Sequence, residues 1–254
     1  MWNNANALNK LAAVLITAAT LALAWAGVQW LARHPWFAIK TVRVVGDTER
    51  VNEITLRTSL VKRMRGTFFT TNLAEIKRTA EGLPWVRRAQ VSRHWPNAIV
   101  IRLEAHQPLA RLNEAQLVNT LGEPFTVNLG EVEMLAKLPE LVGPEGTSAQ
   151  MSERYRVLRH HLEPLGLLPV RVLLSDRLSW TVGLQQGTVL ELGRDIGAQP
   201  VEERLTRFAQ YWDASIRKLG VPQRVDLRYR DGFAFYSPGL RVKAAPQPSA
   251  VRTQ

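Results

Sequence analysis

The strongest constraint in this sequence is an apolar run of 22 residues near its amino terminus. Residues 11 to 32 read LAAVLITAATLALAWAGVQWLA and contain no ionisable side chain. A helix of that length covers about 33 Å, which is enough to cross the hydrocarbon core of a bilayer. Trp25, Trp30 and Trp36 lie toward one end of the run, where tryptophan favours a membrane interface. We therefore predict a transmembrane helix at residues 11 to 32.

A cleaved signal peptide is the alternative for the same run. Lys10 precedes the apolar residues, and Ala22-Leu23-Ala24 is similar to a small-residue cleavage site. The apolar character continues through Val28 and Leu31, which favours an anchor. Basic residues stand on both sides of the run, so the charge pattern leaves its orientation open.

The positive charge of the chain is concentrated in one region. The 254 residues carry 33 Lys and Arg against 22 Asp and Glu, a formal net charge of +11. Residues 33 to 111 hold 15 basic and 6 acidic side chains, whereas residues 112 to 254 hold 17 and 16. A basic surface suits phosphates, anionic lipid or an acidic protein equally well. The sequence has no cysteine, which excludes disulfides and thiolate metal sites.

Residues 37 to 108 predict a small domain with two helices and three strands. We expect a strand at residues 39 to 45, helices at 52 to 64 and 72 to 83, and a hairpin of strands around the turn Pro96-Asn97. Asn72 with Glu75 three residues later indicates a capped helix start. The order β-α-α-β-β is that of a POTRA domain. The residues that we expect the first helix to bury are Ile54, Leu60, Val61 and Met64.

Residues 112 to 237 predict a second, antiparallel β domain with flanking helices. Helices are expected over residues 151 to 165 and 201 to 212, from apolar side chains at spacings of three and four. The segment LPELVGPEG at 138 to 146 is expected to be a loop. Residues 238 to 254 have the composition of a disordered tail. The fold class is therefore α+β behind one transmembrane helix. The expected strands are 117 to 119, 125 to 128, 170 to 175, 179 to 184, 188 to 193, 225 to 229 and 233 to 237.

The sequence gives little support for catalysis. His160 and His161 are adjacent on a predicted helix and point about 100° apart, which does not suit one metal ion. No GxSxG, HExxH, GxGxxG or GxxxxGK[ST] string occurs. Two distant carboxylates of a cell-wall glycosidase would leave no local motif, so that alternative stays open. We expect no enzyme activity, no catalytic residues, no cofactor and no metal.

Seven motifs follow one another behind the amino-terminal apolar run: LPWV (83 to 86), SRHWPN (92 to 97), LPELVGPEG, SWTVGL, ELGR (191 to 194), RLTRF (204 to 208) and VDLRYRDGF (225 to 233). In this order they resemble the FtsQ/DivIB family of bacterial cell-division proteins over residues 8 to 237. Leu112 and Asn119 depart from the family pattern, which has tryptophan and aspartate there. The resemblance implies a single-span inner-membrane scaffold of the divisome, at the division septum, with a cytoplasmic tail at residues 1 to 10 and periplasmic domains. It also implies binding of the coiled-coil proteins FtsB and FtsL, and a link between early and late septal proteins.

The resemblance also implies where the partner binds. In the family, a segment of FtsB adds a strand to the last strand of the β domain, and an arginine matching Arg177 pairs with an acid of the partner. For Tyr229 and Phe233, packing within the hairpin is the alternative to partner contact. The residues of the matching strand that carry the contact are Arg228, Tyr229, Asp231, Gly232 and Phe233.

Arg87, Arg88 and Arg93 form a possible second docking face on the POTRA hairpin, for another membrane division protein. A solvated face or contact with lipid headgroups is the alternative. Nucleic acid fits poorly, because exposed stacking aromatics and a DNA-binding motif are missing. Three other functions remain open for the chain: a POTRA protein of envelope assembly, a periplasmic wall hydrolase, and a basic nucleic-acid binder.

Overall fold

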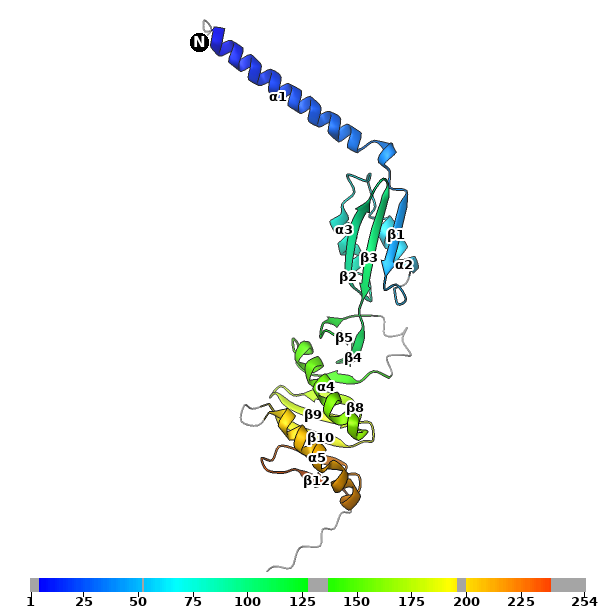
Figure 1. Ribbon diagram of the computed structural model, residues 1–254, viewed down its shortest axis with the longest axis vertical. Helices are drawn as coiled ribbons and strands as arrows, with labels where there is room; N and C mark the ends of the chain where they lie inside the picture. Colours follow the sequence, from blue (N-terminus) through cyan, green and yellow to red (C-terminus); the bar gives the residue numbers. More distant parts are fainter. Residues whose placement is uncertain (1–4, 52, 128–136, 196–199, 239–254) are drawn as a thin grey trace, which may run out of the picture. The chain divides into compact units, whose positions relative to one another are not determined.

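The chain divides into two compact units between His106 and Gln107, each with its own sheet and core (Figure 1). The structure is a computed structural model that describes residues 5–51, 53–127, 137–195 and 200–238. The division falls just before the junction expected at residue 108, because strand β4 (Pro108–Leu112) pairs within the second sheet. The α+β fold class is confirmed.

Helix α1 (Ala5–Ala32) begins before the predicted span and contains it. An 18-residue stretch within Leu8–Ala32 has a mean hydropathy of 2.1, and none of that stretch is buried in the protein. In the described part of the chain this is the one helix long and apolar enough to cross a membrane. The hydroxyls of Thr17 and Thr20 donate to helix carbonyls four residues earlier, at 2.8 and 3.0 Å. Both polar groups are therefore satisfied within the helix, as an apolar environment requires.

The first unit has a three-stranded sheet in the order β1-β3-β2. Strand β1 (Thr41–Gly46) runs parallel to β3 (Ala98–Ala105), and β2 (Val86–His94) runs antiparallel to it. Side chains on β3 alternate between the core and solvent, as expected for a sheet covered on one face. The buried members are Ile99, Ile101, Leu103 and Ala105.

Two short helices cover that sheet face. Helix α3 (Leu73–Glu81) begins as predicted, because the Asn72 side chain accepts from the backbone N–H groups of Ala74 and Glu75 at 3.1 and 3.2 Å. Helix α2 (Glu53–Val61) is shorter than predicted. The prediction of which α2 side chains are buried was partly wrong. The i, i+4 pair that faces the core is Leu56 and Leu60, whereas Ile54 and Val61 are 77% and 68% exposed.

The second unit is built on a nine-stranded sheet with two helices. After β4 its elements are β5 (Gln116–Asn119), β6 (Pro124–Phe125), β7 (Glu140–Val142), α4 (Ser148–Leu162), β8 (Pro169–Leu174), β9 (Ser179–Leu184), β10 (Val189–Arg194), α5 (Val201–Leu219), β11 (Arg224–Asp226) and β12 (Ala234–Tyr236). The strand order in the sheet is β12-β11-β10-β9-β8-β7-β4-β5-β6. Strand β7 lies inside the segment that was predicted to be a loop. That prediction was wrong because three residues are too few to show a strand period. Short 3-10 turns occur at Pro35–Phe37 and Glu163–Leu165.

Three strand pairs in this sheet are parallel, in addition to the antiparallel meander that the sequence predicted. The pair β7·β8 is connected through α4, and the pair β10·β11 through α5. A helical crossover returns the chain to the same end of the sheet, so the strands on either side of it run parallel. The third parallel pair is β4·β7.

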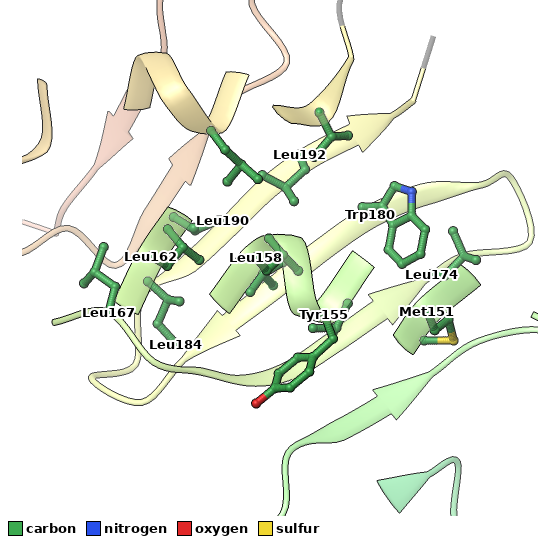
Figure 2. Packing of buried hydrophobic residues seen from close by; sticks show 14 of the residues in the cluster. Met151, Tyr155, Leu158, Leu162, Leu167, Leu174, Trp180, Leu184, Leu190 and Leu192 are labelled. Atoms are coloured by element: carbon green, nitrogen blue, oxygen red, sulfur yellow. The ribbon is translucent and has the colours of Figure 1, made fainter. Parts of the chain in front are cut away.

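The core of the second unit lies between α4, α5 and one face of the sheet. Figure 2 shows Met151, Tyr155, Leu158 and Leu162 of α4 directed at apolar strand residues. These helix residues carry the predicted spacing of four, three and four, and all of them are buried. Trp180 of β9 is 1% exposed and packs in the same cluster.

Some predicted segments lie wholly or partly outside the described residues. Asn128, at the end of the predicted strand 125 to 128, is one of these, and so is nearly all of the predicted tail, residues 239 to 254. The final hairpin forms, but β11 ends at Asp226 rather than at residue 229. The residues expected on the last strand therefore lie in the loop between β11 and β12.

Candidate partner-binding surface

Strand β12 lies at one end of the nine-stranded sheet. It pairs with β11, matching Val225 with Phe235, and within the described residues no strand pairs with its other side. Ala234 and Tyr236 are exposed, and Tyr236 retains 60% of its surface. An edge strand of this kind presents backbone N–H and C=O groups that can pair with another chain. The strand is three residues long, which limits the number of such bonds.

An aromatic cluster lies beneath β12. Phe235 stacks on Trp212 of α5 with ring centroids 6.4 Å apart and planes 15° apart. The ring centroid of Phe233 lies 5.3 Å from that of Phe235 and 5.9 Å from that of Phe208. We call these four residues the β12 aromatic cluster. Because Phe233 is partly buried in it, this predicted contact residue supports the strand from within the domain.

Arg228 is held at the start of the loop by two carboxylates. Its guanidinium makes a bidentate contact with Asp226, at 2.9 and 2.6 Å, and lies 3.2 Å from Glu191. The hydrogen bond from Arg228 lowers the pKa of Asp226, and the same contact raises the pKa of Arg228. The backbone N–H of Leu227 also donates to the Glu191 carbonyl at 2.9 Å. These contacts attach the loop to β10.

Gly193 of β10 leaves room for this arrangement. Its φ is +73°, and an added Cβ would lie 2.8 Å from Cγ of Arg228. Only glycine adopts that backbone conformation readily and also allows the arginine stem to pass. The glycine of the ELGR motif thus allows the Arg228 side chain to pass close to β10.

Tyr229 and Asp231 project from the same loop into solvent. Tyr229 is 57% exposed, and Asp231 is also exposed. Arg207 of α5 donates to the carbonyls of Tyr229 and Arg230, which ties the tip of the loop to the helix. The loop and α5 border a shallow hollow lined by Arg207, Gln210, Tyr211, Ser215 and residues 230 to 233, including Gly232.

Arg177 lies at the same end of the sheet as this loop. It is exposed in the turn between β8 and β9. Strands β8, β10 and β11 all run in one direction, so the turn after β8 and the loop after β11 leave the sheet at one end. Two to three strand spacings separate them, roughly 10 to 15 Å. The structure therefore brings Arg177 to the same rim as the loop, without a direct contact between them.

Of the three arginines of the possible second docking face, Arg87 and Arg88 both lie beside Glu104, whereas Arg93 is engaged elsewhere. Arg88 is exposed on the sheet face opposite the helices, in register with Glu104. Arg87 lies at a β-bulge and pairs with Glu104 at 2.6 Å. Arg93 donates to the carbonyls of Phe68 and Thr71 at 2.5 and 2.7 Å. Arg93 thus anchors a loop, and a docking face there would rest on Arg88.

Two buried arginines, one on α4 and one on α5, contact the sheet and were not predicted from the sequence. Arg204 donates to the carbonyls of Leu192 and Arg194, and burial lowers its pKa. Arg154 of α4 contacts Asp195 and lies over the ring of Trp180 at 5.3 Å. A signal was present, because Arg204 falls on the apolar stripe that includes Val201, Leu205 and Phe208.

The described residues contain no group of three or more His, Cys, Asp or Glu side chains that could hold a metal ion. His160 and His161 contact each other edge to face, with ring centroids 5.4 Å apart. The candidate surface of the second unit consists of an edge strand, a polar loop and an arginine, a set suited to binding a chain.

Comparison with known proteins matches both units. Residues 37–106 match the family model described as POTRA domain, FtsQ-type, and residues 110–228 match Cell division protein FtsQ/DivIB, C-terminal. A protein of Burkholderia pseudomallei (strain K96243) named Cell division protein FtsQ is 40% identical over 242 residues, which are 95% of this chain and 96% of the relative. The chain belongs to the FtsQ/DivIB family.

Other relatives carry the same name at similar coverage. The FtsQ of Bordetella pertussis is 38% identical over 251 residues, 92% of each chain. The FtsQ of Neisseria gonorrhoeae is 28% identical over 235 residues, 92% of this chain and 94% of the relative. Family membership gives this protein a role in cell division, and it confirms the POTRA assignment made from the strand and helix order.

Proposed function

We propose that this FtsQ-family protein is a non-enzymatic divisome scaffold whose β12 edge receives a strand of FtsB, with FtsL bound in the same complex. Its amino terminus is cytoplasmic, both units are periplasmic, and it links early and late septal proteins at the division site. The observation that carries the proposal is the open edge of β12 beside an exposed polar loop.

Backbone pairing supplies the attachment in this proposal. A strand added to β12 would use N–H and C=O groups that β11 leaves available. The β12 aromatic cluster holds the edge in place from below, through the Phe235 ring on Trp212. Because the edge is already formed, mainly the partner segment has to become ordered on binding, which reduces the entropy cost.

The exposed side chains of the rim supply specificity. Tyr229 and Asp231 are accessible, and Arg177 is positioned to pair with an acidic residue of FtsB. Arg228 and Phe233 act differently in this account, because the first is engaged by Asp226 and Glu191 and the second packs in the aromatic cluster. They position the loop.

A binding titration tests this function. The full chain in nanodiscs is titrated with the periplasmic segment of FtsB from the same organism, with and without FtsL. We expect Tyr229→Ala to weaken binding about tenfold or more, as for an exposed aromatic at the centre of an interface. Val221→Ala is the matched control, since Val221 is 56% exposed in the same unit and lies just before β11.

The outcomes separate the proposal from its rivals. Equal binding by wild type and Tyr229→Ala would remove the loop from the site. An absence of binding, with FtsL present as well, would contradict the FtsB assignment. Digestion of purified peptidoglycan by the chain would instead support a wall hydrolase.

A further inference from the structure

Three separate segments of the first unit converge at the end of α1. Thr67 donates from Oγ1 to the Ala32 carbonyl, the last residue of α1, at 2.5 Å. The N–H of Phe68 donates to the Phe37 carbonyl at 2.6 Å. The N–H of Lys40 donates to the Asn97 carbonyl in the β2–β3 turn at 2.9 Å. Residues 32 to 40, 67 to 71 and 93 to 97 therefore form one end of the POTRA domain, next to the helix that spans the membrane.

Each segment places an aromatic side chain in solvent at this end. Trp36 is 81% exposed, Trp95 is 66% exposed and Phe69 is 49% exposed. The buried ring of Phe68 joins two of them, with centroids 5.2 Å from Phe69 and 6.1 Å from Trp95. We call Trp36, Phe69 and Trp95 the aromatic base. Single exposed aromatics are common, but three that converge from distant segments mark a contact surface.

The charge around the aromatic base has one sign. Residues 30 to 40, 62 to 72 and 93 to 98 contain no Asp or Glu. All six of their basic residues are exposed, among them Arg33, Lys40 and Arg65. Arg63 pairs with Glu75 at 3.1 Å, and Arg93 donates to loop carbonyls. Tryptophan prefers the headgroup level of a bilayer, where its ring meets apolar chains and its N–H meets water. Lysine and arginine beside it are attracted to anionic headgroups.

The position of the base relative to α1 selects the partner. The chain from Ala32 to Trp36 is four residues, which spans at most roughly 14 Å. The 67 to 71 loop lies at the end of α1 through the Thr67 contact. A helix of 28 residues is about 42 Å long, the thickness of a bilayer with its headgroups. The base is therefore continuous with the membrane-spanning segment and lies at its outer boundary.

We propose that the aromatic base, with Arg33, Lys40 and Arg65, is a phospholipid-binding surface that holds the POTRA domain against the bilayer where α1 leaves it. The occupant is the headgroup layer of the surrounding membrane. This surface limits how the POTRA domain tilts on its anchor, and it leaves β12, in the other unit, to bind protein. The inference depends on α1 crossing the membrane and is independent of FtsB binding.

The absence of cysteine makes the test direct, because single cysteines can be labelled without removing others. An environment-sensitive fluorophore is attached at His94→Cys, next to Trp95, in the full chain in nanodiscs that contain anionic phospholipid. His94 is exposed at the membrane end of β2. The matched control is Asp47→Cys, which follows the far end of β1, roughly 20 Å away. Lipids with a nitroxide on the headgroup then quench at collision distance.

We expect blue-shifted emission at position 94 and several-fold stronger quenching there than at position 47. Replacing Phe69 and Trp95 by serine should reduce quenching at position 94 to the control level, with helix content retained by circular dichroism. With Phe69 and Trp95 unchanged, water-like emission and weak quenching at position 94, equal to those at position 47, would overturn the proposal. That comparison stands even if the serine variant does not fold. Because the nitroxide is carried by the lipid headgroup, strong quenching assigns the surface to lipid.

Discussion

The two units use aromatic side chains in opposite ways. In the first unit Trp36 and Trp95 turn outward at the end of α1, and both are more than half exposed. In the second unit Phe208 and Trp212 are buried beneath β12, where Phe235 stacks on Trp212 and Phe233 meets Phe208 edge to face. An outward cluster among basic residues suits a lipid surface, whereas an inward cluster stiffens an edge strand. The difference fits the two proposals, in which the first unit contacts the membrane and the second unit binds a partner.

The largest effect that this comparison predicts is on folding of the second unit. Phe235→Ala should lower the free energy of unfolding by about 2 to 3 kcal/mol, because it removes a stacked aromatic beneath β12. Trp95→Ala should cost about 0.5 kcal/mol or less, as for a surface substitution. Chemical denaturation of the full chain in detergent measures both. Similar losses for the two variants would contradict the inward and outward assignment.

The next effect concerns the charge at the rim. Arg177→Glu should weaken FtsB binding about tenfold, since it places like charges opposite an acidic partner residue. Arg156→Glu is the control, because Arg156 is a half-exposed arginine on α4 in the same unit. Isothermal titration of the full chain with the FtsB segment gives both values. If the two variants bind equally, Arg177 has no part in the contact.

A smaller effect is expected from the basic face of the POTRA domain. Arg88→Glu reverses an exposed charge, while the structural contacts of Arg87 and Arg93 stay intact. We predict a partial loss of septal recruitment of a fluorescent fusion in dividing cells, with FtsB binding unchanged. Normal recruitment would identify Arg88 as an ordinary solvated residue.

The smallest effect is a pH dependence at the loop. Arg228 holds the pKa of Asp226 below its usual value. A carboxyl with a lowered pKa in the folded state contributes stability above its unfolded pKa, and the contribution is lost as the pH falls through the folded value. The difference in melting temperature between wild type and Asp226→Asn should therefore be constant near neutral pH and shrink below about pH 4. A difference that stays constant to lower pH would argue against the Arg228 clamp.

Periodic and capped elements were predictable from the sequence. The Asn72 cap, the α4 stripe from Met151 to Leu162 and the hairpin after Asp226 need only neighbours along the chain. Strand β7 was not predictable, because its short run depends on β4 and β8 for pairing. The order β-α-α-β-β was sufficient for the POTRA domain, which the family model confirms.

The candidate sites were only partly predictable, for the same reason. The resemblance pointed to residues 225 to 233 as the strand that receives the partner, whereas the open edge is β12 and Tyr229 lies in the loop before it. The packing of Phe233 depends on Phe208 of α5, which is distant in sequence. Arg93 looked like a surface charge, yet its carbonyl partners lie more than 20 residues away in sequence. The convergence of Trp36, Phe69 and Trp95 likewise needs the tertiary fold.

Hydrogen–deuterium exchange can show whether FtsB adds a strand to β12. Exchange is measured for the full chain in nanodiscs with and without the periplasmic segment of FtsB. Peptides covering Ala234–Tyr236 are compared with peptides covering Thr41–Gly46, an edge strand of the POTRA sheet. We expect slower exchange in β12 on binding and unchanged exchange in β1. Protection of β1 with β12 unchanged would contradict it.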